Sequence, residues 1–109
     1  MHIGNIGDLT IYKMLADDTK LKILKILSGS EKCVSDIMSE VGVSQTLVSH
    51  KLKDLRENGL VSSFRSGKNI VYRLSDESIV SLLNFGEEAG QNIRKICNCV
   101  ECESEVSGN

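Results

Sequence analysis

Apolar residues recur every three or four positions in five segments of the chain, which is the spacing of one buried helix face. The predicted helices span residues 3–15, 19–28, 34–40, 45–58 and a last segment that begins near residue 76. Asp17 and Ser44 precede two of these segments, and their side-chain oxygens can accept the free backbone N–H groups of a first helical turn. In the 45–58 segment, Val48, Leu52 and Leu55 share one face, so we expect them in the core.

The pattern changes between residues 60 and 74, where apolar and polar residues alternate. This alternation predicts two short strands, 60–64 and 70–74, joined by the polar, glycine-containing loop 65–69. A helix, a short turn containing Gly42 and a second helix form a helix-turn-helix, and a hairpin directly after it is a wing. The sequence therefore predicts a mainly α fold with a small β-hairpin (α+β). Its architecture is a winged helix-turn-helix with about five helices and a two-stranded wing.

The last predicted helix carries an apolar stripe over residues 79–96 that is longer than a three-helix core needs. Small residues lie in the middle of this stripe, so a second helix can approach it closely. We therefore expect a homodimer built on the first and last helices; the alternative is that these faces only close the monomer's own core. The predicted organisation is one domain, 1–96, followed by an acidic, cysteine-containing tail, 97–109.

The 109-residue chain has a formal net charge of −2, but its charges are unevenly distributed. Residues 42–74 contain six Lys or Arg against two Asp or Glu, whereas residues 75–109 contain two against seven. A local basic excess on a helix-turn-helix is typical of proteins that bind nucleic acid. We therefore expect double-stranded operator DNA as a partner and assign DNA binding and dimerisation to residues 1–96.

The outward face of the predicted 45–58 helix carries side chains that suit the major groove of DNA. Lys and Arg neutralise phosphates, while Ser, Thr and Gln reach base edges or phosphate oxygens. The start of such a helix points into the groove, and basic residues of the wing would contact a flanking groove or phosphates. The predicted DNA-binding residues are Ser44, Gln45, Thr46, Ser49, His50, Lys53, Arg56, Arg65 and Lys68. The same polarity would also fit a solvated helix face, and for His50 alone this alternative fits equally well.

Neither a membrane span nor a signal peptide is indicated, so we expect a cytoplasmic protein whose four cysteines are reduced. Reduced cysteines are candidates for metal ligands or redox switches. Cys97, Cys99 and Cys102 lie within six residues and can converge on a thiophilic ion such as As(III), Cd(II), Pb(II) or Zn(II). For tetrahedral zinc or cadmium, Cys33 is the candidate fourth ligand.

Other functions of these cysteines remain open. The three C-terminal cysteines could form a thiol redox or persulfide switch, which nearby Arg94 or Lys95 would favour. They could also belong to a tail without a sensing role, and Cys33 could be a small buried apolar residue. An enzyme is not indicated, because the sequence offers no nucleophile–base pair, glycine-rich phosphate loop or suitably spaced carboxylate pair. A rival non-enzymatic function is a metal-buffering or protein-interaction module on the same fold.

Three stretches, LADDTKLKIL, SQTLVSHKLKDLRENGLV and GKNIVYRL, together carry a family resemblance that covers residues 14–79. This segment resembles the ArsR/SmtB family of winged-helix, metal-sensing repressors. The resemblance implies a homodimer built on the first and last helices, which represses a metal- or thiol-stress operon. It also implies that an inducer releases the protein from DNA, whereas DNA binding itself requires no cofactor.

The inducer sites of that family are only partly present in this sequence. One site has the pattern Cys-Val-Cys-Asp, which here reads Cys33-Val34-Ser35-Asp36, so that a serine replaces the second thiol. The zinc site at the start of the last helix keeps Asp76, but its partner positions carry Ser78, Ala89 and Asn92. We therefore expect a repressor released by a thiophilic metal or metalloid that the C-terminal cysteines bind. The alternatives are a thiol redox or persulfide-responsive repressor and a winged-helix protein without a small inducer.

Overall fold

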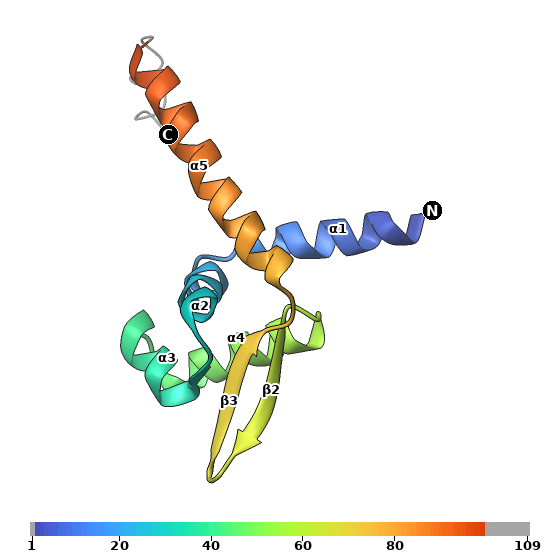
Figure 1. Cartoon of the computed structure of the whole chain (residues 1–109), viewed down its shortest axis with the longest axis vertical. Coiled ribbons are helices and arrows are strands. Elements are labelled where there is room, and N and C mark those ends of the chain that lie inside the picture. Colours follow the sequence, from blue (N-terminus) through green and yellow to red (C-terminus); the bar gives the residue numbers. More distant parts are fainter. Residues whose placement is uncertain (1, 100–109) are drawn as a thin grey trace. The chain divides into compact units, whose positions relative to one another are not determined.

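The computed structural model describes the backbone of residues 2–99 and the side chains of residues 9–96 (Figure 1). This part of the chain contains five helices and three strands. In chain order they are α1 (His2–Leu15), α2 (Asp18–Gly29), β1 (Lys32–Cys33), α3 (Val34–Val41), α4 (Gln45–Glu57), β2 (Val61–Ser66), β3 (Asn69–Leu74) and α5 (Glu77–Cys99). The prediction of a mainly helical fold with a small antiparallel sheet is confirmed.

The helix starts at α2 and α4 are fixed by the two capping side chains that the sequence indicates. The Asp17 carboxylate accepts the backbone N–H of Lys20 at 2.9 Å, and the Ser44 hydroxyl accepts that of Leu47 at 3.2 Å. Between α3 and α4 the chain turns at Gly42, whose φ of 81° lies in the left-handed region that glycine adopts without strain. These local features set the helix-turn-helix formed by α3 and α4.

The core of the first compact unit, Met1–Ile79, lies among α2, α3, α4 and the start of β2. Val48, Leu52 and Leu55 are all fully buried, which confirms the expected inward face of α4. The other buried apolar side chains of this unit are Ile23, Leu24, Leu27, Ile37, Leu60 and Val61. The buried faces of α2, α3 and α4 therefore determine which residues of α4 face solvent.

The sheet has the antiparallel order β1-β3-β2. In the wing, Val61 lies opposite Leu74 and Ser66 lies opposite Asn69, so only two residues form the turn. The expected five-residue loop, 65–69, is therefore too long, because both strands extend further than the alternating pattern indicated. Gly67 has a φ of 63° in this turn, which is the left-handed conformation that tight hairpins require.

The predicted two-stranded wing is present, and the short strand β1 adds a third strand beside β3. Lys32 lies opposite Tyr72 and Cys33 lies opposite Val71. A strand of two residues cannot show an alternating pattern, so sequence periodicity does not reveal it. Because β1 leads directly into α3, it joins the middle of β3 to the first helix of the helix-turn-helix.

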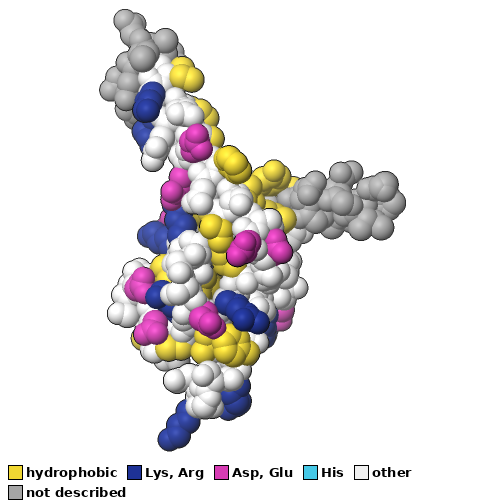
Figure 2. Space-filling model, in the orientation of Figure 1, with side chains coloured by type: hydrophobic (Ala, Val, Ile, Leu, Met, Phe, Trp, Pro, Cys, Tyr) yellow, Lys and Arg dark blue, Asp and Glu magenta, His cyan; other side chains and the backbone are white. Residues whose placement is uncertain are grey.

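The second unit, Val80–Asn109, contains most of α5. The first turn of this helix is capped by Asp76, whose carboxylate accepts the backbone N–H of Ser78 at 2.9 Å. Hydrogen bonds from Ser78 lower the pKa of Asp76. Hydrophobic side chains lie along α5 (Figure 2), and Phe85, Ile93 and Ile96 are all exposed. Within residues 2–99, no helix has the length and apolar character needed to cross a membrane.

Candidate nucleic-acid interface

The face of α4 opposite its buried side carries the predicted DNA-contacting residues. Val48, Leu52 and Leu55 point into the core, whereas Ser49, His50 and Lys53 between them are exposed. The predicted DNA-contacting side chains on and before this helix are all exposed: Ser44, Gln45, Thr46, Ser49, His50, Lys53 and Arg56. From Gln45 to Arg56 this face extends about 16 Å at the helical rise per residue. Its length and polarity suit a helix that enters the major groove.

The wing supplies the other two predicted residues. Arg65 lies near the end of β2, and Lys68 is in the two-residue turn. Both side chains are exposed, and Lys and Arg side chains gather at the tip of the hairpin in Figure 2. All nine residues predicted to contact DNA are therefore accessible.

The first turn of α4 and the tip of the wing are neighbours in space. Gln45 lines one surface hollow together with Lys68, Asn69 and Ile70 of the wing. The other side of this hollow is formed by α3 and the residues before it: Cys33, Val34, Ser35 and Met38. The folded chain thus brings the expected base-contacting and phosphate-contacting segments to one surface.

Lys51 is one of the six basic residues of segment 42–74, but its side chain faces α2. Its Nζ lies 2.8 Å from Oδ2 of Asp17, and its side chain is only 21% exposed. Three residues further along α4, Asp54 pairs with Lys20, which is buried. The apolar periodicity of the predicted 19–28 helix does not indicate that Lys20 is buried. The signal that could have identified these pairs is the matched spacing of Asp17 with Lys20 and of Lys51 with Asp54.

Phe64 and Arg73 form a further contact on the wing. The guanidinium of Arg73 lies 5.0 Å from the centroid of the Phe64 ring, within the range of a cation–π interaction. Phe64 is itself opposite Val71 in the β2–β3 pairing. The basic charge of Arg73 is therefore held against the sheet surface rather than at the wing tip.

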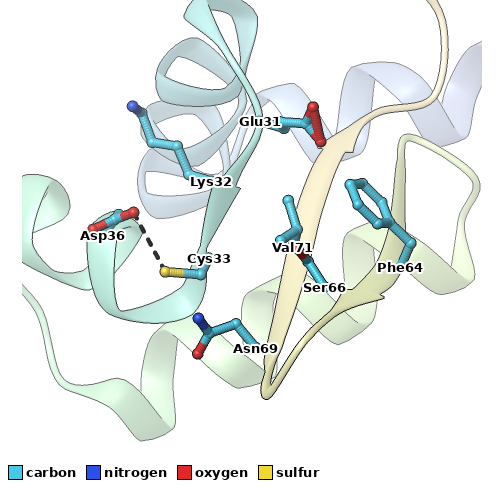
Figure 3. Close-up of a pocket in the computed structure, with 8 residues that line it drawn as sticks. All are labelled: Glu31, Lys32, Cys33, Asp36, Phe64, Ser66, Asn69 and Val71. Carbon is cyan, nitrogen blue, oxygen red and sulfur yellow. Dashed lines mark hydrogen bonds between the residues drawn. The ribbon is translucent and has the colours of Figure 1, made fainter.

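Cys33 is half-buried at the end of β1, immediately before α3. Its thiol donates to Oδ2 of Asp36 at 3.3 Å (Figure 3). The same sulfur lies 3.2 Å from the Ser35 hydroxyl. The hollow drawn in that view is about 370 Å³ and is lined on its other side by Phe64, Ser66, Asn69 and Val71. The Cys-Val-Ser-Asp segment therefore presents one thiol and one carboxylate close together.

The proposed thiolate cluster lies outside the described side chains. Cys97 and Cys99 are in the last turn of α5, and Cys102 follows the described backbone. Within the described residues, no group of three or more His, Cys, Asp or Glu side chains could hold a metal ion. The ligand set of Cys97, Cys99, Cys102 and Cys33 thus stays a prediction, and so does the division between residues 1–96 and 97–109.

The helix-turn-helix of α3 and α4, followed by the β2–β3 hairpin, defines a winged helix-turn-helix protein. A family model described as "Bacterial regulatory protein, arsR family" matches residues 17–63. The arsenical resistance operon repressor of Staphylococcus aureus is 34% identical over 95 residues, which cover 84% of this chain and 89% of that protein. The chain belongs to the arsR family of bacterial regulatory proteins. This membership confirms the resemblance and the expectation of a regulator rather than an enzyme.

Two further comparisons agree with this family. A transcriptional repressor SmtB homolog from Synechocystis sp. is 37% identical over 71 residues, covering 65% of this chain and 54% of that protein. The chain thus spans about half the length of this relative. A solved structure from Mycobacterium bovis matches with a TM-score of 0.78 and 25% identity, over 86% of this chain and 89% of that one. That structure is the homodimeric winged helix-turn-helix DNA-binding domain of a possible ArsR-family transcriptional regulator.

Proposed function

We propose that this protein is a transcriptional repressor that binds operator DNA as a homodimer and is released by a thiophilic metal or metalloid. The observation that carries the proposal is the common surface formed by the first turn of α4 and the wing tip, where Gln45 and Lys68 line one hollow. A surface assembled from a recognition helix and an adjacent basic hairpin suits one groove of DNA and its flanking phosphates.

The chemistry of the exposed residues suggests a division of roles along this surface. Residues at the start of α4 contact base edges, because this end of a recognition helix lies deepest in the groove. They are Gln45, Thr46, Ser49 and His50, with Ser44 just before them. Lys53 and Arg56, further along α4, contact phosphates. Arg65 and Lys68 contact phosphates or a groove flanking the site.

The dimer is proposed to form through α1 and α5. Leu9 and Tyr12 on α1 are 55% and 62% exposed, and Ile93 and Ile96 on α5 are 59% and 63% exposed. Large apolar side chains left in water at these levels are typical of a surface that a partner covers. A second copy is the proposed partner, since the similar M. bovis domain is homodimeric. Two recognition helices would then read half-sites about 34 Å apart.

Cys97, Cys99 and Cys102 are proposed to bind the inducing ion, with Cys33 as a candidate fourth ligand. Soft thiolates select As(III), Cd(II), Pb(II) or Zn(II), and the similar S. aureus protein is the repressor of an arsenical resistance operon. Suppose that the ion binds the DNA-free dimer more tightly than the DNA-bound dimer. The difference between these two binding free energies is then the free energy by which the ion weakens DNA binding. A thiol redox or persulfide switch would use the same cysteines. The same DNA-release assay can therefore distinguish a metal inducer from a thiol switch.

The test is fluorescence anisotropy of the reduced full chain on a labelled duplex from upstream of its own gene. The proposal expects binding that weakens steeply with salt and release by equimolar arsenite or cadmium. The variant with Cys97, Cys99 and Cys102 all replaced by serine should bind DNA normally and stay bound when the ion is added. Release of this variant would overturn the assignment of the inducer site. Release of the wild type by a persulfide donor or oxidant, but by neither ion, would favour the thiol switch instead.

A further inference from the structure

Two ion pairs connect the start of α2 to the middle of α4. The Nζ of Lys51 lies 2.8 Å from Oδ2 of Asp17, and the Nζ of Lys20 pairs with Oδ2 of Asp54. Each segment contributes one acidic and one basic residue three positions apart, which is the spacing of neighbours on one helix face. The spacing between Asp17 and Lys20 matches the spacing between Lys51 and Asp54. A shift of α4 along α2 would therefore break both of these α2–α4 ion pairs at once.

The α2–α4 ion pairs are partly buried, unlike the surface pair between Asp18 and Lys22. The side chain of Lys20 is 9% exposed and that of Lys51 is 21% exposed, against 57% for Lys22. A charge withdrawn from water and separated from its partner is strongly unfavourable. Orientations of α4 relative to α2 that separate either pair are therefore disfavoured. The ion pairs thus favour one orientation of α4 in addition to stabilising the fold.

Both carboxylates have second partners that hold them in place. Asp17 also accepts the backbone N–H of Lys20 at 2.9 Å, and Asp54 accepts the side-chain amide of Asn58 at 3.1 Å. Hydrogen bonds from Lys51 and Lys20 lower the pKa values of Asp17 and Asp54, respectively. Both acids are therefore ionised near neutral pH, where the pairs are complete.

The helix held by these contacts carries the proposed base-contacting residues. A rotation or shift of α4 would move Gln45 and Ser49 together, because they lie on the same rigid element. It would also change where Gln45 lies relative to Lys68, which shares a hollow with it. The relative placement of α4 and the wing, rather than any one contact, decides whether both segments reach DNA together.

We propose that the α2–α4 ion pairs position the recognition helix α4 for operator binding, an inference that rests on the proposed function. Their four residues act through α4 and touch no DNA themselves. Lys51 is accordingly a positioning residue, whereas its exposed neighbour Lys53 is a phosphate contact. The two lysines are predicted to respond differently when DNA affinity is measured as a function of salt.

The first test compares Asp17→Asn with Asp18→Asn. Asparagine retains an oxygen that caps α2 but loses the charge that holds Lys51. Asp18→Asn makes the same charge change one residue later, at the exposed pair with Lys22. By charge alone, both variants should bind DNA as tightly as the wild type or more tightly, because each removes a negative charge. Positioning predicts instead that Asp17→Asn weakens binding to the upstream duplex about tenfold, while Asp18→Asn does not.

The second test uses the salt dependence of binding. Lys51→Met should weaken binding without changing the slope of log K against log salt concentration, whereas Lys53→Met should lower that slope by about one. Lys51→Arg should bind DNA with the affinity of the wild type, unlike Lys51→Met, because arginine keeps the positive charge beside Asp17. The double variant Asp17→Asn, Lys51→Met should bind no more weakly than Lys51→Met alone, because the two changes remove the same contact. A slope reduced by Lys51→Met would make Lys51 a phosphate contact and overturn the proposal.

Circular dichroism establishes that each variant is folded at the assay temperature. Asp54→Asn provides an independent variant of the second pair if Asp17→Asn does not fold. Equal binding by Asp17→Asn and Asp18→Asn, with salt-dependent binding by the wild type, overturns positioning but leaves the proposed function intact. Absence of salt-dependent binding by the wild type overturns both.

Discussion

Gln45, the first residue of α4, and Lys68, in the turn of the wing, line the same surface hollow although they belong to different elements. This relationship makes the helix and the hairpin parts of one proposed DNA-binding surface. It also separates two kinds of contact that can be tested independently. One side chain is an amide suited to base edges, and the other is a cation suited to phosphates.

Gln45→Ala and Lys68→Ala should therefore have different effects on DNA binding. Loss of the Gln45 amide should reduce discrimination against altered operator sequences by about 1–3 kcal/mol. Loss of the Lys68 charge should weaken binding to all sequences alike and lower the salt slope by about one. Anisotropy titrations on the upstream duplex and on a scrambled duplex, at several salt concentrations, measure both effects. Equal loss of discrimination in both variants would contradict this division of roles.

Leu52→Ala should destabilise the fold through the core of the helix-turn-helix. Leu52 is completely buried, and truncating a buried leucine to alanine costs about 2–5 kcal/mol through lost burial and the cavity that remains. Leu47→Ala is the matched control, because Leu47 is on the same helix but is 37% exposed. Urea unfolding followed by circular dichroism measures the free energy of unfolding. A similar loss in both variants would show that α4 packs differently from the structure.

Gly67→Ala should weaken the wing. The space around Gly67 is open, so an added methyl group meets no atom, but the φ of 63° is unfavourable for alanine. The expected cost is about 1–2 kcal/mol, which is the penalty of the left-handed conformation for residues with a Cβ. Gly29→Ala is the control, because its surroundings are equally open and its backbone does not have this conformation. Its free energy of unfolding should be unchanged or higher.

The stability of the protein should fall on acidification as the α2–α4 ion pairs are lost. Their hydrogen bonds hold the pKa values of Asp17 and Asp54 below the ordinary carboxyl value of 3.8. The corresponding stability is present above that ordinary value and is lost as pH falls through the lower folded-state values. Asp54→Asn should have a smaller acid-dependent decrease than the wild type. Urea midpoints measured between about pH 7 and pH 2 test this, and identical pH profiles would contradict it.

The helices could be predicted from sequence because their signals are local. The spacing of Val48, Leu52 and Leu55 gives the inward face of α4, and Ser44 gives its start. The exposure of the seven predicted DNA-contacting residues on and just before α4 follows from that face, because a helix that buries one side presents the other to solvent.

Other features depend on residues that are distant in the chain and have no local signal. β1 exists because Lys32 and Cys33 pair with β3, which a two-residue segment cannot indicate by itself. The burial of Lys20 depends on Asp54, so it could not be deduced from the pattern of α2 alone. The wing turn is shorter than expected, because cross-strand pairing extends through polar residues that resemble a loop in sequence.

The pairing of β3 with both β1 and β2 limits how the wing can change its reach. β1 pairs with Val71 and Tyr72 in the middle of β3, so the length of the hairpin can vary only at the tip beyond Ser66 and Asn69. One residue added to each strand would lengthen the hairpin by about 3.4 Å and turn its end side chains to the opposite face of the sheet. Two residues added to each strand would extend it by about 7 Å and restore the original face. Homologous wings that present a basic tip to the same side should therefore differ in strand length by even numbers of residues.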